Sequence, residues 1–300
     1  MPNLVKLNVL EFLSAAVYCE DRILKHAGFR FYKAGGGAFV WKDGKKIFAW
    51  ALMVPEDNNF ALVRIYTPAH LRRRGYAAAL IRELQKAGTD ITCSVKQDMP
   101  QYEAANALLH KMGFRQQKSM YNFSVPCEAF KDWDKTPTGK RISACAQYFL
   151  KKDFRIISFA DATTEQLDYV KNAGKNDFQC AIDPAQWFQR GVEFYEKGCF
   201  ILLKNEKIIA FALVSCPAAN SCVLRLLATT RKFIGRGYAF MLCWALTELS
   251  KTEDFQGRVL KYGIHVNNTP ALKMQENFLG AYSPHKVLLN FYRWEKNKDE

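Results

Sequence analysis

The sequence predicts an α+β protein of two tandem domains, each a mixed, mostly antiparallel sheet flanked by helices. The chain has 300 residues, which is more than one hydrophobic core usually spans. When the chain is shifted by 162 positions, Leu62–Leu84 aligns with Leu224–Leu246 without a gap, and eight of the 23 positions are identical. Chance at ordinary composition gives about one or two identities. The same order of expected strands and helices surrounds both copies.

Three strands are expected at the centre of each copy. In the first copy, residues 37–67 read as strand, Asp-Gly turn, strand, polar turn and strand. In the second copy, residues 199–229 repeat this meander with turns at "KNEK" and "PAANS". A helix over 12–28 is expected before the first meander, and a strand at "FRIISF" and helices over 163–173 and 184–198 before the second.

An apolar helix follows a glycine motif in each copy. Its stripe has the spacing i, i+1, i+4, i+5, i+8 in both cases, formed by Tyr76, Ala77, Leu80, Ile81 and Leu84 or by Tyr238, Ala239, Leu242, Cys243 and Leu246. A short strand, a second helix and an aromatic strand pair are expected to complete each copy. The aromatic pairs fall around "FRQQKSMYNFSV" and "YSPHKVLLNFYRW".

These patterns place the domain boundaries. We expect an N-terminal domain over 1–125, a connecting segment over 126–152 and a C-terminal domain over 153–300. The connecting segment contains Pro126, Pro137 and Gly139, and a helix of its own is expected near "ISACAQYFL". The C-terminal "EKNKDE" is expected to fray.

The amino-acid composition limits the cellular compartment and the kinds of partner that we expect. The net charge is +14 and the pI is 9.3, which suits an anionic ligand, an acidic protein or nucleic acid without choosing among them. Nine cysteines form no Cys-x-x-Cys and show no zinc spacing. We therefore expect reduced thiols, a cytoplasmic protein and no metal. No signal peptide and no membrane span are expected. The oligomeric state is not predicted.

The glycine motif predicts an anion site. Each motif has the order strand, basic loop, glycine, helix, and a helix N-terminus presents unpaired N–H groups and the positive end of the dipole. Glycine lets a ligand approach that backbone, and phosphate or pyrophosphate fits best. Arg72, Arg73 and Arg74 would add charge-assisted contacts. The motif is neither a Walker loop nor the dinucleotide fingerprint.

The segment "IYTPAHLRRRGYAAALI" resembles the acetyl-coenzyme A signature of the GNAT (GCN5-related) acyltransferases, Arg/Gln-x-x-Gly-x-Gly/Ala after a strand. Arg72, Arg73, Arg74, Gly75, Tyr76 and Ala77 match it in order. "ALLHKMGF" resembles the family's second cofactor-side motif. The resemblance implies that amides of residues 72–77 hold the pyrophosphate of acetyl-CoA or another acyl-CoA. It also implies that the strand at Ile65, Tyr66 and Thr67 pairs with the pantetheine arm.

The second copy departs from this pattern. Its hexad is Ile234, Gly235, Arg236, Gly237, Tyr238, Ala239, so the leading Arg or Gln has become isoleucine. Backbone amides could still bind phosphate, and we expect a weaker second site over residues 235–239. The later motif keeps Asn268 and Ala271, but Leu279 stands where a glycine is expected. We expect the first copy to be the better cofactor site.

The catalytic groups are less apparent. Many family members carry a tyrosine acid on the last helix, and the matching residues here are Leu109 and Gln275. The strands before the glycine loops contain no carboxylate. Asp98 and Tyr102 in the first copy and His265 in the second are the catalytic candidates. His110 points in a different helical direction from the missing tyrosine, and Cys93 is expected to pack in the core.

These observations lead to one expected function and two alternatives. The expected function is an N-acetyltransferase, an acyltransferase for groups other than aminoacyl, moving acetyl from acetyl-CoA to a primary amine of unknown acceptor. The first alternative is a non-catalytic acyl-CoA-binding or protein-interaction module, because both copies lack the tyrosine. Nucleic-acid binding is the second, permitted by charge and aromatic content but supported by no motif.

Overall fold

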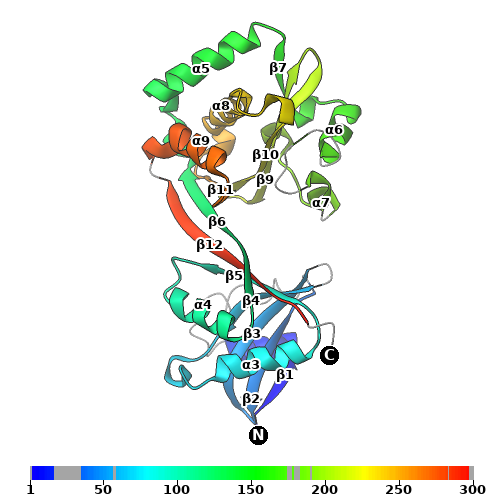
Figure 1. The fold of residues 1–300 in the computed structure, drawn as a ribbon, viewed down its shortest axis with the longest axis vertical. Helices are drawn as coiled ribbons and strands as arrows, with labels where there is room; N and C mark the ends of the chain where they lie inside the picture. Colours follow the sequence, from blue (N-terminus) through cyan, green and yellow to red (C-terminus); the bar gives the residue numbers. More distant parts are fainter. Residues whose placement is uncertain are drawn as a thin grey trace. The chain divides into compact units, whose positions relative to one another are not determined.

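The structure, a computed structural model, describes residues 2–16, 35–56, 59–173, 178, 183–189, 191–282 and 284–296. The chain folds into two compact units (Figure 1): unit 1 is Met1–Met120 with Val287–Glu300, and unit 2 is Tyr121–Lys286. Both are α+β, as the sequence predicts. None of the described helices is long and apolar enough to cross a membrane.

Unit 1 is built on a sheet with the strand order β1-β2-β3-β4-β5-β12, followed by the first part of β6. Neighbours are antiparallel in the pairs β1–β2, β2–β3, β3–β4 and β5–β12, whereas β4 and β5 are parallel. The strand bounds are β1 (Asn3–Leu7), β2 (Gly37–Asp43), β3 (Lys46–Glu56), β4 (Asn59–Tyr66), β5 (Ile91–Lys96), β6 (Arg115–Pro126) and β12 (His285–Trp294). The expected meander and its Asp-Gly turn are confirmed.

Helices cover both faces of this sheet because side chains alternate along β3. Ala49, Ala51 and Met53 pack with the apolar sides of α3 (Tyr76–Lys86) and α4 (Tyr102–Lys111). Trp50 and Leu52 instead pack with Phe12 of α1 (Val9–Ala16). The helix expected over 12–28 therefore begins earlier, at Val9, and its part beyond residue 16 lies outside the described residues. The helix expected after the first glycine motif is confirmed as α3.

The end of the chain completes the sheet of unit 1. Strand β12 pairs with β5 from Leu289↔Lys96 to Trp294↔Ile91, and Tyr292 is buried beneath α4. The expected boundaries at 125 and 153 follow chain order and stay a prediction about where the repeats begin and end.

The aromatic ends are corrected by the structure. Each forms one long strand, β6 or β12, rather than a strand pair. No glycine, proline or Asn-Gly interrupts either run at its middle, so nothing in the local sequence reverses the chain there.

Unit 2 repeats the design. Its sheet has the order of the second part of β6, then β11-β10-β9-β8-β7. The pairs β7–β8, β8–β9 and β9–β10 are antiparallel, and β10–β11 is parallel. The strands are β7 (Phe154–Ser158), β8 (Phe200–Lys204), β9 (Lys207–Ala218), β10 (Ser221–Thr229) and β11 (Val259–His265). The expected "KNEK" turn is confirmed by positive φ at Asn205 and Glu206.

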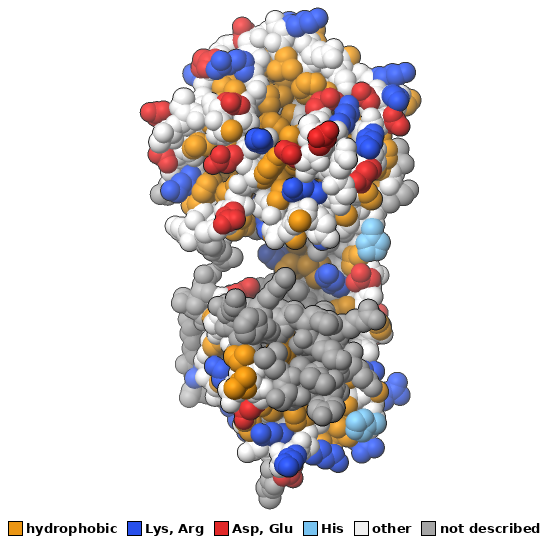
Figure 2. All heavy atoms as spheres, turned by 180° about the vertical axis from the view of Figure 1, so that it is seen from behind, with side chains coloured by type: hydrophobic (Ala, Val, Ile, Leu, Met, Phe, Trp, Pro, Cys, Tyr) orange, Lys and Arg blue, Asp and Glu red, His pale blue; other side chains and the backbone are white. Residues whose placement is uncertain are grey.

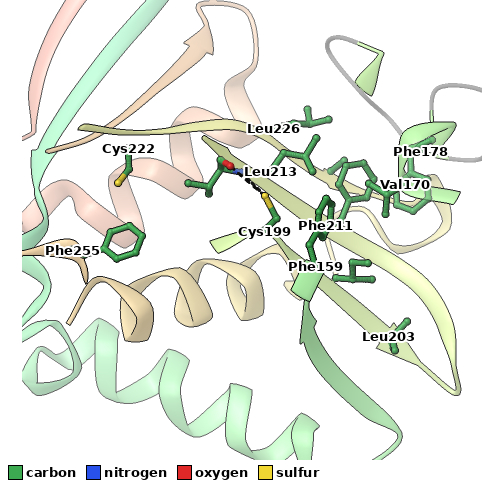
Figure 3. Packing of buried hydrophobic residues seen from close by; sticks show 14 of the residues in the cluster. Phe159, Val170, Phe178, Cys199, Leu203, Phe211, Leu213, Cys222, Leu226 and Phe255 are labelled. Atoms are coloured by element: carbon green, nitrogen blue, oxygen red, sulfur yellow. Dashed lines mark hydrogen bonds between the residues drawn. The ribbon is translucent and has the colours of Figure 1, made fainter. Parts of the chain in front are cut away.

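Helices again lie on both faces. Helix α8 (Tyr238–Ser250) packs Met241 and Leu242 against Ala210 and Ala212 of β9. On the other face, Phe211 and Leu213 pack with Val170 of α6 (Thr164–Lys171), with α7 (Pro184–Gln189) beside them. Figure 3 shows Phe178, Val170 and Phe211 gathered in this core. The helix expected over 184–198 is confirmed only to Gln189, where the α-helix ends.

The expected helix in the connecting segment is confirmed as α5 (Pro137–Leu150). It packs on α8, while α9 (Thr269–Leu279) follows β11. Within each unit, short 3-10 helices connect consecutive elements. Among them are η1 (Ala69–Leu71), η3 (Trp133–Lys135) and η7 (Arg231–Phe233).

Candidate functional site

The parallel strands part in both units. In unit 1, β4 and β5 pair only from Phe60↔Ile91 to Leu62↔Cys93, although β4 continues to Tyr66. In unit 2, β10 and β11 pair from Ser221↔Val259 to Leu224↔Tyr262, although β10 continues to Thr229. Among the described strands, the final residues of β4 and β10 therefore have no strand partner on this side.

A β-bulge occurs where the strands part. Met53 pairs with Leu62 but Leu52 pairs with Arg64, which leaves Val63 as the extra residue. In unit 2, Val214 pairs with Leu224 but Leu213 pairs with Leu226, which leaves Arg225. Both extra residues hold the same position in the repeat. Because a bulge bends and twists its strand, it turns the strand's end away from its parallel neighbour. Backbone amides and carbonyls beyond the bulge can then pair with an extended, amide-bearing ligand.

The first glycine loop has an alternating backbone. Arg73 and Gly75 have positive φ, 61° and 82°, whereas Arg74 between them does not. Such alternation turns successive N–H groups toward one concave point, which makes an anion nest. Gly75 is the N-cap of α3 and provides no side-chain cap, so N–H groups of Tyr76 and Ala77 are left for a ligand. Apart from Gly75 and its two chain neighbours, no described residue has an atom within 4 Å of a Cβ built at Gly75.

The side chain of Arg72 contacts the start of the first glycine loop and the end of the strand before it. Its Nε donates to the backbone oxygen of Thr67 at 3.1 Å, and its guanidinium lies 6.0 Å from the ring centre of Tyr66. Tyr66 and Ile65 end β4, directly before the loop. Arg72, Arg73 and Arg74 are exposed. The structure therefore gives Arg72 a bracing contact, which joins the predicted strand to the predicted loop.

The second loop has the same backbone with different side chains. Gly235 and Gly237 have φ of 77° and 81°, matching Arg73 and Gly75. Ile234, at the place of Arg72, is 45% exposed. Tyr238 is buried and begins α8, and Ala239 follows in its first turn. The ring of Phe233 lies within 6 Å of three cationic groups, those of Lys204, Lys232 and Arg236.

The catalytic candidates of unit 1 lie after β5. Asp98 is exposed in the turn that follows this strand, and Tyr102 is the first residue of α4. Asn290 of β12 donates from Nδ2 to the Tyr102 hydroxyl oxygen at 2.9 Å. The Asn290 Oδ1 accepts from Ser119 at 2.7 Å. The hydroxyl proton of Tyr102 is thus left free for another acceptor. Sequence reasoning missed Asn290, which is far from Tyr102 along the chain.

Two other residues of α4, His110 and Leu109, are excluded as proton donors by their contacts. Tyr292 donates its hydroxyl to Oδ1 of Asn106 at 2.9 Å, and His110 meets the Tyr292 ring edge-on at 5.5 Å. Leu109 is buried at the helix end, where the N–H of Phe114 bonds its carbonyl at 3.0 Å and Gly113 has φ of 77°. This is a Schellman end with its hydrophobic contact.

Unit 2 provides two groups near the end of β11. His265 is its last residue, and its Nδ1 accepts from the backbone N–H of Asn267 at 3.2 Å. The neutral ring then carries its proton on Nε2. Burial raises the pKa of Tyr262 above its usual range, while the amide of Gln275 opposes that rise. Tyr262 occupies the repeat position of Cys93, and sequence reasoning missed it. Asn268 caps α9 by accepting from Ala271 at 3.2 Å.

Burial also decides the state of Cys93. It raises the pKa of the Cys93 thiol to about 12, so the reactive thiolate is scarce near neutral pH. Cys93 packs with the α3 and α4 core, which supports the expected packing role. In the described part of the chain, no group of three or more His, Cys, Asp or Glu side chains is placed to hold a metal ion.

Comparison with known proteins identifies the family. The model of the acetyltransferase (GNAT) family matches residues 4–114 and 162–281, which together are most of the chain. The chain therefore belongs to the GNAT family, with one repeat in each matched stretch. No curated protein gives a significant match.

Solved structures show the same fold at low identity. A tandem GNAT protein from the clavulanic acid biosynthesis pathway, solved without acetyl-CoA, has a TM-score of 0.62 and 14% identity, with all of both chains covered. A GCN5-related N-acetyltransferase from Sphaerobacter thermophilus has a TM-score of 0.62 and 11% identity, covering 95% of this chain and 90% of the other. The GCN5-related glucosamine N-acetyltransferase region of a fungal multi-domain GH3 enzyme has a TM-score of 0.68 and 13% identity; 97% of this chain and 38% of that chain are covered.

Proposed function

We propose that this protein is an acyl-CoA-dependent N-acyltransferase that transfers an acetyl group from acetyl-CoA to a primary amine. One structural arrangement, present in both units, carries the proposal. Two parallel strands separate at a β-bulge, and an anion nest follows at a helix N-terminus. The first repeat is the primary cofactor site in this proposal, because Arg72 braces its loop. The second repeat, over Gly235–Ala239, is a further site.

The geometry fits the two parts of coenzyme A. The pantetheine arm is extended and carries two amides, so it can pair with β4 beyond the point where β5 departs, near Ile65, Tyr66 and Thr67. Its pyrophosphate suits the nest over residues 72–77, where backbone N–H groups and the helix dipole favour negative charge. Binding in this order directs the thioester toward the carboxyl ends of β4 and β5, where Asp98 and Tyr102 lie.

Acyl transfer to an amine has three requirements: the amine loses a proton, the developing oxyanion is stabilised and the thiolate leaves. In the first repeat we assign proton removal to Asp98, directly or through water, and proton donation to Tyr102. Asn290 orients Tyr102 and leaves its O–H free. In the second repeat His265 is the candidate base. Alignment of amine and thioester supplies a further part of the rate.

Binding followed by turnover tests this function. Calorimetry is expected to show acetyl-CoA and CoA binding to the purified protein at sub-millimolar concentration. Release of the CoA thiol with a broad panel of primary amines is then expected, and it separates an enzyme from the non-catalytic module. Absence of binding in this range contradicts the proposed function. Binding without turnover on any amine favours the module.

Gly75→Glu locates the primary site. A carboxylate at the loop repels the pyrophosphate, so acetyl-CoA affinity at this site is expected to fall about 100-fold or more. Gly44→Glu is the matched control, because Gly44 also has positive φ and open space around its Cα, but lies in the β2–β3 turn. Unchanged binding to the Gly75 variant excludes the first loop as the pyrophosphate site.

Tyr102→Phe tests proton donation. The variant removes the O–H and keeps the ring, so kcat is expected to fall about 100-fold while KM for acetyl-CoA stays within about twofold. Loss of stability without a change in kcat assigns Tyr102 to holding α4 on β12 instead.

The cytoplasmic location stays part of the proposal. The described cysteines, seven of the nine in the chain, are free, which fits a reducing compartment. On the face drawn in Figure 2, Lys and Arg side chains are interspersed with Asp and Glu. On the described surface of unit 2 in this view, that mixture leaves no continuous basic track of the kind that nucleic-acid-binding proteins present.

A further inference from the structure

Two cysteine side chains of unit 2 are in contact at the turn between β9 and β10. Cys216 lies near the end of β9 and Cys222 near the start of β10, and their Sγ atoms are 3.3 Å apart. Both are free thiols. The second glycine loop follows the other end of β10, after Thr229. The thiol pair therefore lies outside the proposed cofactor site.

A β-bulge brings the two thiols together. Cys216 and Pro217 of β9 both lie opposite Cys222 alone, and a bulge of this kind re-aims the side chains of its strand. The strand pairs on either side of the bulge are Ala218↔Ser221 and Ser215↔Val223. Residues opposite each other in antiparallel strands have Cα atoms about 4.5–5.5 Å apart, which is within the range that a disulfide bridges. The backbone at this place is therefore already suited to a disulfide.

The first repeat has neither the thiols nor this bulge. The residues 162 positions earlier are Val54 and Phe60. Val54 pairs with Ala61 and Pro55 pairs with Phe60, so the strands β3 and β4 remain in regular register here. The fold of the repeat therefore requires neither feature, and the thiol pair is a property of unit 2.

The two thiols differ in exposure. Cys216 is partly exposed, whereas Cys222 is fully buried. Figure 3 shows Cys222 and Phe255 at the same end of the hydrophobic core of unit 2. A small oxidant in water can therefore reach Cys216, while Cys222 waits beside it in the core. This is the arrangement of a reacting thiol and a resolving thiol.

Arg258 places a positive charge beside the pair. Its Nη1 donates to the Sγ of Cys222 at 3.8 Å, and its guanidinium lies 5.4 Å from the ring centre of Phe255. Arg258 forms no ion pair with any acidic residue that the structure describes. Burial raises the pKa of the Cys222 thiol, and the contact with Cys216 adds to that rise, whereas Arg258 lowers it. The guanidinium therefore favours the thiolate at a sulfur that burial would otherwise keep protonated.

We propose that Cys216 and Cys222 form a redox modification site, which hydrogen peroxide converts to a disulfide. The thiolate of Cys216 attacks one peroxide oxygen, so that an S–O bond forms, the O–O bond breaks and hydroxide leaves as water after taking a proton. The thiolate of Cys222 then attacks the Cys216 sulfur; the S–S bond forms, the S–O bond breaks and a second water leaves. The two thiols lose two electrons, which peroxide gains.

The disulfide would join β9 to β10 beside the parallel pair Cys222↔Leu260. It closes a short loop, so its effect on the unfolded chain is small. A thiol reductant reverses the modification by exchange. None of these steps uses CoA, and the inference therefore stands apart from the proposed function.

Mass spectrometry of the unaltered protein tests the site directly. Trypsin releases residues 208–225 as one peptide, which contains Cys216 and Cys222 and no other cysteine. The protein is treated with hydrogen peroxide at a dose that oxidises the exposed Cys145, then unfolded, alkylated with iodoacetamide and digested. The peptide is expected to be two hydrogens lighter than its reduced form and to carry no alkyl group, and dithiothreitol is expected to restore two alkylation sites. Two alkyl groups on this peptide when Cys145 is oxidised overturn the inference.

Two variants test the order of the steps and the part of Arg258. In Cys222→Ser the sulfenic acid on Cys216 has no resolving thiol, so dimedone is expected to trap it on the peptide. Dimedone on Cys222 in Cys216→Ser, with none on Cys216 in Cys222→Ser, overturns this order. Arg258→Gln is expected to slow disulfide formation about fivefold. Lys261→Gln is the matched control, because it removes a charge from an exposed position of β11 and is expected to change the rate less than twofold. Equal rates for these two variants overturn the part of Arg258.

Discussion

The two glycine loops have the same backbone conformation, but different residues stabilise it. Positive φ occurs at Arg73 and Gly75 in the first repeat and at Gly235 and Gly237 in the second. In the first loop a non-glycine residue is held in the left-handed region, and Arg72 braces the turn through Thr67. The second loop has glycine at the strained position and an exposed isoleucine in place of the brace.

Because two different sets of side chains surround the same backbone, the loop conformation belongs to the fold rather than to one set of side chains. The strand, its bulge and the following helix recur at equivalent positions in both repeats, and the loop between them is forced into one path. Side chains then decide how strongly the nest is supported and what surrounds it. The first repeat relies on arginine, and the second has α5 beside its loop.

The largest expected effect comes from detaching α5. In Gly139→Ala, the new methyl group would overlap the backbone carbonyl of Trp133, which cannot move without disturbing the buried Trp133 ring. We expect a loss of about 3 kcal/mol in the unfolding free energy of unit 2, measured by urea denaturation.

A matched control for Gly139→Ala is Gly257→Ala. Gly257 has open space around it and φ of 70°, so the cost is expected to be only about 1 kcal/mol. Equal losses for the two variants would show that α5 is not anchored at Trp133.

An intermediate effect is expected from Arg72→Ile, which gives the first loop the residue of the second. The variant loses the bond to the Thr67 carbonyl and the contact with Tyr66. We expect about 1 kcal/mol less stability, and acetyl-CoA affinity at the first site about fivefold lower, by thermal unfolding and calorimetry. Arg82→Ile, which removes a charge from the exposed side of α3 outside the motif, controls for net charge. An Arg72 variant with unchanged affinity contradicts the bracing role.

No larger effect on stability than that of Arg72→Ile is expected from exchanging the residues with positive φ. Gly235→Arg places a side chain in the left-handed region and is expected to cost about 1 kcal/mol. Arg73→Gly relieves that strain but gives the unfolded chain more freedom, so its net change is expected to stay within about 0.5 kcal/mol. Thermal unfolding of both variants measures the asymmetry. A large stabilisation by Arg73→Gly would show that relief of backbone strain outweighs the greater conformational entropy that glycine gives the unfolded chain.

Local sequence patterns predicted much of this fold. The Asp-Gly turn, the two meanders and the helices that begin at Tyr76 and Tyr238 follow from short-range signals that the structure confirms. The helix expected near "ISACAQYFL" begins earlier, at Pro137, with Thr136 as its N-cap, so its existence was predicted but its start was not. The hexad comparison also located both loops, because Gly75 and Gly237 stand at the same place in each hexad and both have positive φ.

The remaining features depend on contacts between distant residues. Nothing in the alternation of β12 distinguishes a partner in unit 1 from one in unit 2, so its pairing with β5 could not be read from the sequence. The bond between Asn290 and Tyr102 follows from that pairing. The packing of α5 on α8 is likewise not determined by helical periodicity alone.

We propose that each glycine loop is a pyrophosphate site, which is measured by the number of CoA molecules bound per chain. Calorimetric titration with CoA is expected to give two sites in the unaltered protein, one in Gly75→Glu, one in Gly237→Glu and none in the double variant. Gly44→Glu serves as the folded control with two sites. A single site in the unaltered protein, or two sites retained in the double variant, would contradict the account.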